Sequence, residues 1–482
     1  MKALKGEGVY NVAIIGAGTA GLVTAAGTAG LGGRVALIER HKMGGDCLNF
    51  GCVPSKALIS SARLIHRISR AQDWGLEKHE PQFQFGKVFE RMRSRRAKIA
   101  PNDSQERFES LGVDVFRGDA RFLSPHEIEV AGRRLRAKNF VIAAGSRAGL
   151  PKIAGLSDVP YFTNETIFDN LHSKPGSLVV IGGGPIGCEL GQVMTRLGVR
   201  VTIVQHGAQI LPKEDPDVGE FMRKQFESEG IRVMLKAKPV RAQTVDGGVQ
   251  IEFEGGEKLT ADAMLVAAGR VPNIEKLNLE AAGVRYSQRG IEVNEYMQTS
   301  QPHIYAAGDI AGSFQFTHTA DVMARTVIRN ILMPLQILRG KVALTVVPWA
   351  TYTDPEVARV GLCESEAKKA DIGYDRFTVP MEDIDRAVCE SEEAGFVKVL
   401  TRKGTDEILG VTLIASHAGD LLHEFVLAMK NKIGLGAIAA TIHAYPTFAE
   451  LARKAGDKYN KTRLTPFAKR LFGWLYERAR WP

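Results

Sequence analysis

The sequence predicts an α/β protein with two Rossmann-like dinucleotide-binding units, followed by a smaller α+β domain. Three observations lead to this prediction. The chain has 482 residues, enough for about three domains of ordinary size. One glycine-rich motif occurs twice, each time between an apolar strand and a helix. After about residue 346, short strand-like and helical segments alternate, a texture typical of an α+β domain.

The composition is that of a globular protein. Hydrophobic residues make up 44% of the chain and charged residues 24%, which excludes a fibrous repeat and extensive disorder. There is no run of about 18 apolar residues, so we expect no transmembrane helix. Residues 1–10 lack the apolar core of a signal peptide, and we expect a cytoplasmic protein. The net charge of +9 permits weak attraction to anionic surfaces but does not indicate nucleic-acid binding.

The first glycine-rich motif follows an apolar strand expected over Tyr10–Ile15. Its glycines are Gly16, Gly18 and Gly21. The first allows a tight turn, the second lets backbone N–H groups approach a pyrophosphate, and the third lets helix and strand pack closely. Glu39 ends the next expected strand, where a carboxylate can accept both hydroxyls of an adenosine ribose. This unit therefore fits a flavin dinucleotide.

The second motif repeats this arrangement after a strand expected over Ser177–Ile181. Its glycines are Gly182, Gly184 and Gly187. Gln205 stands where Glu39 stands in the first unit. Glutamine can bond a ribose 2′-hydroxyl but does not repel a 2′-phosphate, which His206 could help to bind. The unit fits a nicotinamide dinucleotide, and the preference for NADH or NADPH stays open.

Three further apolar segments end in small residues, as buried parallel strands do beside a ligand. They are Phe140–Ser146, Ala263–Arg270 and Ile304–Asp309. The candidate ligand contacts at their ends are Ala144, Gly145, Ser146, Gly269, Gly308 and Asp309. Asp309 could bond a ribitol hydroxyl or be an ordinary turn residue.

Helices are expected at about 55–72, 86–111 and 216–229. The second contains the basic stretch Arg91–Arg96, which we interpret as a solvated helix face rather than a nucleic-acid site. In the C-terminal domain we expect strands at Val357–Gly361, Phe396–Thr401 and Ile408–Ile414, and helices at 364–370, 420–432 and 434–441.

Two of the five cysteines, Cys47 and Cys52, lie five residues apart in a glycine-flanked segment just ahead of an expected helix. They can meet as a disulfide, and the helix N-terminus would stabilise their thiolates. A sparse, odd count does not indicate a secreted disulfide framework. Cys188, Cys363 and Cys389 are expected to be free thiols with no role, since free cysteines are usually buried.

These features resemble the class I pyridine nucleotide–disulfide oxidoreductases, the family of dihydrolipoamide dehydrogenase, glutathione reductase and mercuric reductase. The resemblance covers about residues 10–455 and is most specific at the CxxxxC segment. It implies a homodimer in which electrons pass from NADPH or NADH through FAD to the Cys47–Cys52 disulfide and then to the substrate. It implies an FAD-binding domain that begins with residues 1–150, an NAD(P)-binding domain (151–275), a central domain completing the FAD site (276–345), a C-terminal dimerisation domain (346–455) and a tail (456–482).

The resemblance also implies roles for single residues. Cys52 would lie against the flavin, and Cys47 would attack the substrate. Lys56 matches the family lysine near the flavin, and Glu189 its carboxylate partner beside the nicotinamide, which Ile186 would line. The implied FAD site further includes Gly44, Gly45, Ala120, Thr317 and His318. No metal site is expected.

The sequence departs from the family pattern near its C-terminal end. Members that handle dithiols carry a His-Pro pair followed by a glutamate, which together act as acid–base catalyst. Here Glu450 is present, but Tyr445 stands at the histidine position and is a poor base at neutral pH. His443 could substitute for the missing histidine or could merely form a hydrogen bond in the core.

The tyrosine, together with segments 381–387 and 393–399, makes the chain most similar to mercuric-reductase-like proteins. The C-terminal cysteine pair that delivers the soft metal ion in true mercuric reductases is missing, as is an N-terminal CxxC domain. The substrate is therefore left as a disulfide, a lipoamide-like group, or a metal ion or other electrophile.

The tail lies outside the resemblance. Phe467, Leu471, Trp474 and Leu475 fall on one helical face, and the charge around them comes from Lys469, Arg470, Arg478 and Arg480. Such a helix can lie at a membrane interface, or it can pack on its own dimer or over the substrate cleft. An alternative function follows from the tail: a flavoprotein electron-transfer subunit docked to a partner complex or a membrane surface.

Overall fold

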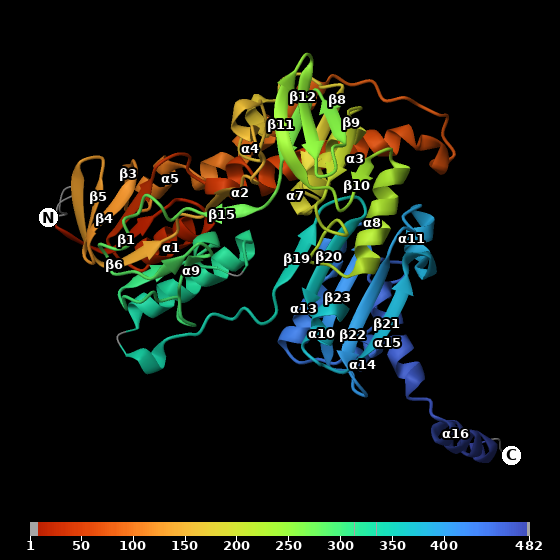
Figure 1. Ribbon diagram of the computed structural model, residues 1–482. Coiled ribbons are helices and arrows are strands. Elements are labelled where there is room, and N and C mark those ends of the chain that lie inside the picture. The colour runs from red at the N-terminus through yellow and green to blue at the C-terminus, as the bar shows by residue number, and fades with distance from the viewer. Residues whose placement is uncertain (1–7, 313, 334, 480–482) are drawn as a thin grey trace. The chain divides into compact units, whose positions relative to one another are not determined.

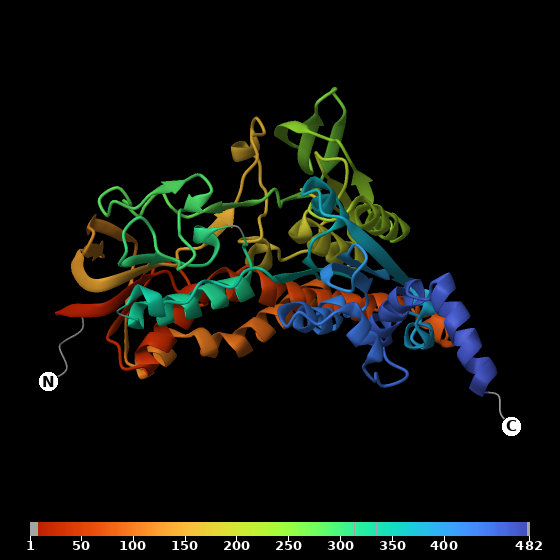
Figure 2. The same cartoon turned by 90° about the horizontal axis from the view of Figure 1, so that it is seen from below.

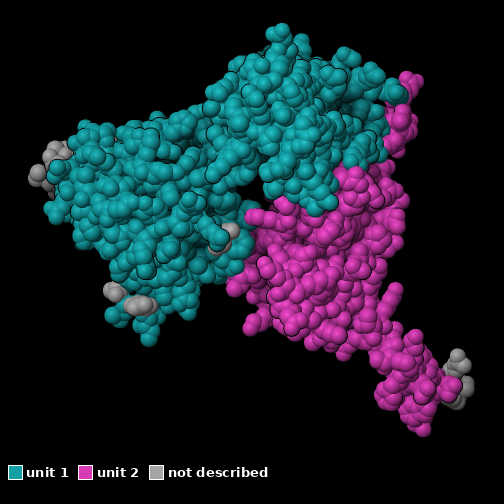
Figure 3. All heavy atoms as spheres, in the orientation of Figure 1, with its two compact units in different colours: residues 1–70, 78–208, 226–344 teal, residues 71–77, 209–225, 345–482 magenta. Residues whose placement is uncertain are grey.

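The computed structural model describes residues 8–312, 314–333 and 335–479. The chain forms two compact units, coloured teal and magenta in Figure 3. Unit 1 comprises residues 1–70, 78–208 and 226–344, and unit 2 comprises residues 71–77, 209–225 and 345–482. Within the described ranges, no helix is long and apolar enough to cross a membrane. The boundaries of the five finer segments stay a prediction.

A seven-stranded sheet organises the first nucleotide-binding region of unit 1. Its strands are β1 (Val9–Ile15), β2 (Val35–Glu39), β3 (Val113–Arg117), β4 (Ala120–Ser124), β5 (Glu127–Val130), β6 (Arg133–Ile142) and β18 (Ile304–Ala306). The order is β3-β2-β1-β6-β5-β4, with β18 also paired to β6. The pairs among β3, β2, β1, β6 and β18 are parallel, and β5 and β4 extend the sheet antiparallel.

Two helices, α1 (Thr19–Gly30) and α9 (Thr317–Leu332), pack against each other beside this sheet (Figure 1). β1 is almost wholly apolar and is buried over its last four residues, as a strand covered on both faces must be. Core residues from strand and helices, such as Val12, Leu22 and Met323, form one cluster. The small residues of α1 let it lie close to the strand that precedes it.

The second nucleotide-binding region repeats this construction. Its parallel sheet has the order β10-β9-β8-β14. The elements are β8 (Ser177–Ile181), α7 (Pro185–Arg196), β9 (Arg200–Val204), β10 (Arg232–Met234), β14 (Ala263–Val266), and the antiparallel meander β11 (Pro239–Val245), β12 (Gly248–Phe253) and β13 (Lys258–Ala261). Both predicted strand–glycine–helix units are thereby confirmed.

The helix expected over 86–111 is wrong as a single element, because α4 ends at Ile99 and α5 begins at Gln105. Pro101 lacks an N–H and cannot continue an α-helix, and the Ser104 hydroxyl accepts the Arg107 N–H at 3.2 Å to cap α5. The remaining elements of unit 1 are α2 (Gly45–Asn49), α3 (Cys52–Ser69), α4 (Phe85–Ile99), α5 (Gln105–Ser110), α6 (Ile167–Asn170), β7 (Ser146–Ala148), β15 (Arg270–Pro272), β16 (Tyr286–Ser287) and β17 (Gly290–Ile291).

The basic stretch on α4 is only partly solvated. Arg91 donates to the Ala57 carbonyl at 2.9 Å, and Arg96 donates to the Asn49 carbonyl at 3.0 Å. These two arginines tie α4 to α3 and to the end of α2, while Arg91, Ser94 and Arg95 stay exposed, as expected for a solvated helix face.

Unit 2 is built on an antiparallel sheet with the order β19-β20-β23-β22-β21. The strands are β19 (Pro348–Thr351), β20 (Glu356–Gly361), β21 (Tyr374–Pro380), β22 (Phe396–Arg402) and β23 (Ile408–Ala415). The helices that lie or begin in this unit are α8 (Pro216–Ser228), α10 (Glu364–Lys369), α11 (Asp385–Cys389), α12 (Ala418–Leu421), α13 (His423–Lys430), α14 (Leu435–Ala440), α15 (Glu450–Thr462) and α16 (Pro466–Ala479). The core lies between the sheet and helices α13, α14 and α15.

The predicted tail contains two different structures. Its first residues, from 456, belong to α15, which packs on β21 and β22 and buries Tyr459. The chain leaves this helix at residues 463–465, and α16 follows as a separate helix (Figures 1 and 2). Arg480 lies outside the described residues.

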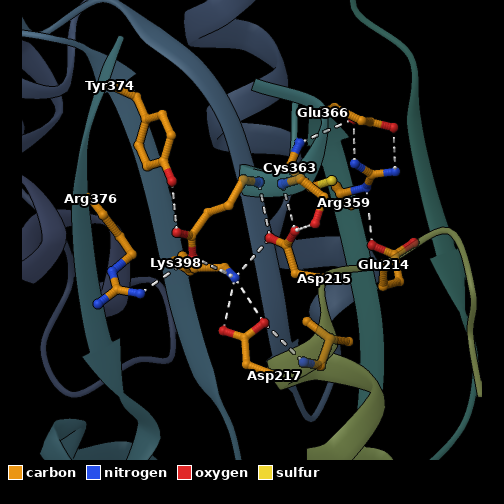
Figure 4. A network of polar contacts seen from close by, with 12 residues as sticks. Glu214, Asp215, Asp217, Arg359, Cys363, Glu366, Tyr374, Arg376 and Lys398 are labelled. Carbon is orange, nitrogen blue, oxygen red and sulfur yellow. Dashed lines mark hydrogen bonds and ion pairs between the residues drawn. The ribbon is translucent and has the colours of Figure 1, made fainter. Parts of the chain in front are cut away.

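A network of buried charges fastens the start of α8, and the residues just before it, to the sheet of unit 2 (Figure 4). Lys398 on β22 is 2% exposed, and its ammonium donates to Asp215 at 2.9 Å, Asp217 at 2.8 Å and Glu364 at 3.2 Å. Asp215 also accepts the first N–H groups of α10, from Glu364 and Ser365, each at 3.0 Å. Burial opposes ionisation of Asp215, but these hydrogen bonds outweigh it and hold its pKa below the usual range.

A second buried cation lies beside this network. Arg359 on β20 is 1% exposed. It pairs with Glu214 at 3.0 Å and Glu366 at 2.6 Å, and its guanidinium lies 4.3 Å from the ring centroid of Trp349. Four consecutive residues, 214–217, therefore supply three carboxylates to two cations of the sheet.

Candidate active site

The first glycine motif forms a turn that no side chain could share. Gly16 has φ +108°, and a Cβ there would lie 2.3 Å from the Ala143 carbonyl oxygen. A Cβ on Gly21 would lie 1.8 Å from the Gly16 carbonyl oxygen. Strand β1, the neighbouring strand end and α1 therefore meet at backbone distance, which exposes the N-terminus of α1 to a ligand.

Glu39 lies at the end of β2, beside this turn. Its carboxylate accepts the N–H groups of Ala17 and His41, each at 2.7 Å. A cavity of about 420 Å³ opens here. The predicted FAD-site residues that line it are Gly16, Glu39, Ala120 and Ala144. The space and the carboxylate fit the adenosine end of a dinucleotide.

The second motif has the same geometry. Gly182 has φ +116°, and a Cβ there would lie 2.3 Å from the Ala267 carbonyl oxygen. The Gln205 side-chain oxygen accepts the Gly183 N–H at 3.1 Å, in the same relation that Glu39 has to Ala17. A neutral amide has therefore replaced the carboxylate without changing the contact. His206 is exposed, and its role stays a prediction.

The cysteine segment lies directly on the first glycine motif. Gly44 and Gly45 both have positive φ, at 86° and 57°. A Cβ on Gly45 would lie 2.5 Å from the Gly18 Cα, so the two backbones approach too closely for any side chain there. This contact brings α2, with Cys47, to the end of α1 where the resemblance predicts FAD.

The two thiols interact across the gap between α2 and α3. Cys52 is the first residue of α3, and the Cys47 thiol forms a hydrogen bond with it. That bond and the nearby Lys56 ammonium outweigh desolvation and lower the pKa of Cys52 to about 6, whereas the same bond and burial raise the pKa of Cys47. Thr317, at the start of α9, places its hydroxyl 3.7 Å from the Cys52 sulfur. Cys52 is thus the thiolate of the pair at neutral pH.

Lys56 and Glu189 form an ion pair, although they are 133 residues apart in the chain. The Lys56 ammonium donates to the Glu189 carboxylate at 2.8 Å, and the glutamate is 6% exposed. Lys56 lies one helical turn after Cys52, and Glu189 lies on α7 with Ile186. The pair connects the cysteine helix to the helix of the second nucleotide unit, as the resemblance predicts.

A cluster around Arg270 was not predicted from the sequence. Its guanidinium donates to the Ser146 hydroxyl at 2.7 Å and pairs with Asp46, next to Cys47, at 3.1 Å. Ser146 in turn donates to Asp309 at 2.5 Å. Asp309 is therefore joined to the strand ends rather than being an isolated turn residue. The available signal was a polar or charged residue directly after each glycine turn, at Gly145, Gly269 and Gly308.

The remaining predicted flavin-site residue, His318, is exposed on α9 and stacks on Phe316 with ring centroids 5.3 Å apart. The other cysteines are not part of the Cys47–Cys52 pair: Cys188 precedes Glu189 on α7, and Cys389 is close enough to Tyr445 to help raise its pKa. Cys188 and Cys363 are buried, and Cys389 is exposed. No group of three or more potential metal ligands occurs among the described residues.

The three predicted acid–base residues of unit 2 do not form one group. Tyr445 donates its hydroxyl hydrogen bond to Asp385 at 2.8 Å, and this bond raises the pKa of the tyrosine. His443 uses its two ring nitrogens for the Glu424 carboxylate and the Thr441 carbonyl, each at 2.9 Å. Both ring nitrogens of His443 are committed to neighbours other than Glu450.

Glu450 is 6% exposed, and Arg453 donates to one of its carboxylate oxygens at 2.7 Å. The other oxygen has no hydrogen-bond partner among the described residues. A buried carboxylate oxygen of this kind is costly to leave unmatched.

Family models match almost the entire chain. The model described as pyridine nucleotide-disulphide oxidoreductase matches residues 10–324, and that of the family's dimerisation domain matches residues 347–455. The second match supports a homodimer.

Similar proteins cover nearly the full length. A dihydrolipoyl dehydrogenase of Thermus scotoductus is 35% identical over 94% of this chain and 98% of its own. A mercuric reductase of Lysinibacillus sphaericus is 33% identical over 95% of this chain and 84% of its own. The solved Cu(II) complex of the HOCl-induced flavoprotein disulfide reductase RclA from Escherichia coli is 26% identical, with a TM-score of 0.85 over 94% of this chain and 99% of that one.

Both family matches and the coverage of these relatives extend over most of the chain. The chain belongs to the pyridine nucleotide-disulphide oxidoreductases, and it is an NAD(P)H-dependent flavoenzyme that uses FAD.

Proposed function

We propose that this enzyme passes electrons from NAD(P)H to an acceptor that needs no proton from a histidine, such as a thiophilic metal ion or another small electrophile. Bound FAD carries electrons from the nicotinamide to the thiol pair. Oxidation of the Cys47–Cys52 dithiol to the disulfide gives two electrons to the acceptor and releases two protons. Cys47 is the contact with the acceptor, and the Cys52 thiolate is stabilised by Lys56 and Thr317.

The observation that carries this proposal is the hydrogen bond from Tyr445 to Asp385. A general acid–base group works best when its pKa lies near the working pH. The pKa of Tyr445 lies above its already high usual value, so its hydroxyl stays protonated and keeps donating to Asp385. Reduction of a disulfide would need a proton for the leaving thiolate, and Tyr445 is badly suited to give it.

The relatives support a metal ion as acceptor. The matched enzymes include mercuric reductases by name, and RclA is described in a complex with Cu(II). Soft thiolate ligands favour such ions. A pKa of about 6 for Cys52 provides a thiolate at neutral pH. A reduced dithiol and a supply of NAD(P)H also fit the reducing cytoplasm, which we propose as the location.

A lipoyl-type disulfide is the second candidate. It is favoured by the dihydrolipoyl dehydrogenase that matches over 98% of its own length, and by the retention of Glu450, the partner of the missing histidine.

Variants at Tyr445 separate the two candidates. With Cu(II) or Hg(II) as acceptor, Tyr445→Phe is expected to stay within about threefold of the wild-type kcat/KM, because no proton passes through the tyrosine. Tyr445→His is expected to raise lipoamide reduction by about tenfold or more, since an imidazole beside the unmatched Glu450 oxygen restores an acid–base pair. NAD(P)H oxidation, followed by the loss of the near-ultraviolet absorbance of the reduced nicotinamide, measures both.

Tyr374→Phe is the matched control, because Tyr374 donates to Glu364 at 2.9 Å in the same unit and lies outside the proposed site. The proposal is contradicted by a wild-type enzyme that reduces lipoamide faster than the metal ions and loses that activity in Tyr445→Phe.

A further inference from the structure

The C-terminal helix α16 is specified by its own residues. The Thr465 hydroxyl accepts the Ala468 N–H at 3.2 Å, and the Thr465 carbonyl accepts the Lys469 N–H at 2.9 Å. Pro466 occupies the first helical position, where proline is favoured. A capped start of this kind fixes where the helix begins without help from tertiary packing.

The helix nevertheless has no packing surface of its own. None of its described residues is buried, and in Figure 1 it stands apart from the sheet of unit 2. Its exposed large side chains are Phe467, Leu471, Phe472, Trp474, Leu475 and Tyr476. An isolated helix of this length is marginally stable in water. Burial of its apolar side chains against another surface would stabilise it.

The net positive charge of α16 and the residues before it indicates what kind of surface the helix would bind. Residues 461–479 contain five basic side chains and one acidic one, so this short stretch holds four of the nine net positive charges of the whole chain. At about 100° per residue Arg470 flanks the face formed by Phe467, Leu471, Trp474 and Leu475, and Lys469 lies on the opposite side. The Arg478 guanidinium lies 4.1 Å from the ring centroid of Trp474. A surface that covers α16 must therefore offer an apolar region to the aromatic and leucine side chains and negative charge to the basic ones.

We propose that α16 lies in the surface of an anionic membrane and attaches the enzyme to it. A second copy of α16 would bring two basic helices together, which like-charge repulsion disfavours. The aromatic content also favours lipid: four of the 14 residues of α16 are aromatic, against 7% of the whole chain. Tryptophan and tyrosine prefer the membrane–water interface, and basic side chains attract anionic headgroups. The proposal does not depend on which acceptor the enzyme reduces.

Co-sedimentation of the full-length holoenzyme with lipid vesicles tests it. The wild type is expected to bind phosphatidylcholine vesicles that contain about 30% phosphatidylglycerol, and not pure phosphatidylcholine. Two variants address the two components of the helix: Trp474→Asp in the apolar face, and the double reversal Lys469→Glu/Arg470→Glu. Each is expected to lower the bound fraction by about tenfold or more, with NAD(P)H oxidation unchanged.

The matched control is Lys368→Glu/Lys369→Glu, an exposed adjacent pair on α10 that gives the same change in net charge; its vesicle binding should equal that of the wild type. Absence of wild-type binding, or binding that the α16 variants leave intact, overturns the proposal. So does a wild-type tetramer in sedimentation velocity that the α16 variants convert to a dimer without any vesicle binding, because a second copy would then cover the helix.

Discussion

Replacing Cys47 with serine is expected to lower the reduction of any acceptor by about a thousandfold or more. A serine oxygen cannot form a disulfide with Cys52, so two electrons can no longer leave the protein through this pair. The Cys52 environment would keep its Lys56 and Thr317 neighbours. Reduction of the bound flavin by NAD(P)H should therefore stay close to the wild-type rate in stopped-flow measurements.

The control for this variant is Cys389→Ser, which removes another exposed thiol and should leave turnover unchanged. If Cys47→Ser instead retained full acceptor reduction, electrons would be leaving directly from the flavin. The electron-transfer alternative inferred from the sequence would then be the better description of the protein.

Replacing Lys398 with methionine is expected to destabilise unit 2 by about 3–5 kcal/mol, the usual cost of removing one partner from a buried ion pair. Methionine keeps most of the apolar stem, but it leaves Asp215 buried without the ammonium that lies 2.9 Å away. Guanidinium unfolding followed by circular dichroism measures the loss. Arg402→Met on the same strand is the control, because its pair with Glu407 is exposed and should contribute about 1 kcal/mol or less.

The same network gives a pH dependence with a definite sign. The pKa of Asp215 is lowered in the folded protein, so the carboxylate contributes stability that is fully present above its unfolded pKa of about 4. That contribution disappears as the pH falls below this value towards the folded pKa. The Lys398→Met variant should therefore show a flatter loss of stability with acid than the wild type. An equally steep loss in both proteins would place the acid-sensitive group elsewhere.

The fold was predictable because its signals are local. The two glycine motifs predict tight turns, and the structure shows why glycine is required there: at Gly16 and Gly182 a Cβ would overlap a carbonyl oxygen. The strand before each motif is short and apolar, and the carboxylate or amide at Glu39 and Gln205 follows at a fixed distance. Helix ends were less predictable. Pro101 marks the interruption between α4 and α5 in the sequence, but a prediction based on helical periodicity alone continued the helix through it.

The candidate site was predictable only where the family pattern supplied it. Lys56 and Glu189 are ordinary helix residues until folding brings them to 2.8 Å. The contacts of Arg270 with Asp46, and of Lys398 with Asp215, join residues about two hundred positions apart. Pattern and propensity carry no information about such pairs, because they arise only when separate elements pack. The hydrogen bond from Tyr445 to Asp385 likewise joins two separate elements and could not be predicted from the sequence.

The most direct test of the central claim, that Cys52 is the thiolate of the redox pair, is a pH titration of the NAD(P)H-reduced enzyme under anaerobic conditions. The long-wavelength absorbance of a thiolate beside oxidised flavin reports its ionisation. We predict a band that is present at neutral pH and titrates with a midpoint near the Cys52 pKa of about 6, and that moves to higher pH in Lys56→Met, which removes the nearby positive charge. A flavin that bleaches at every pH without this band would contradict the account.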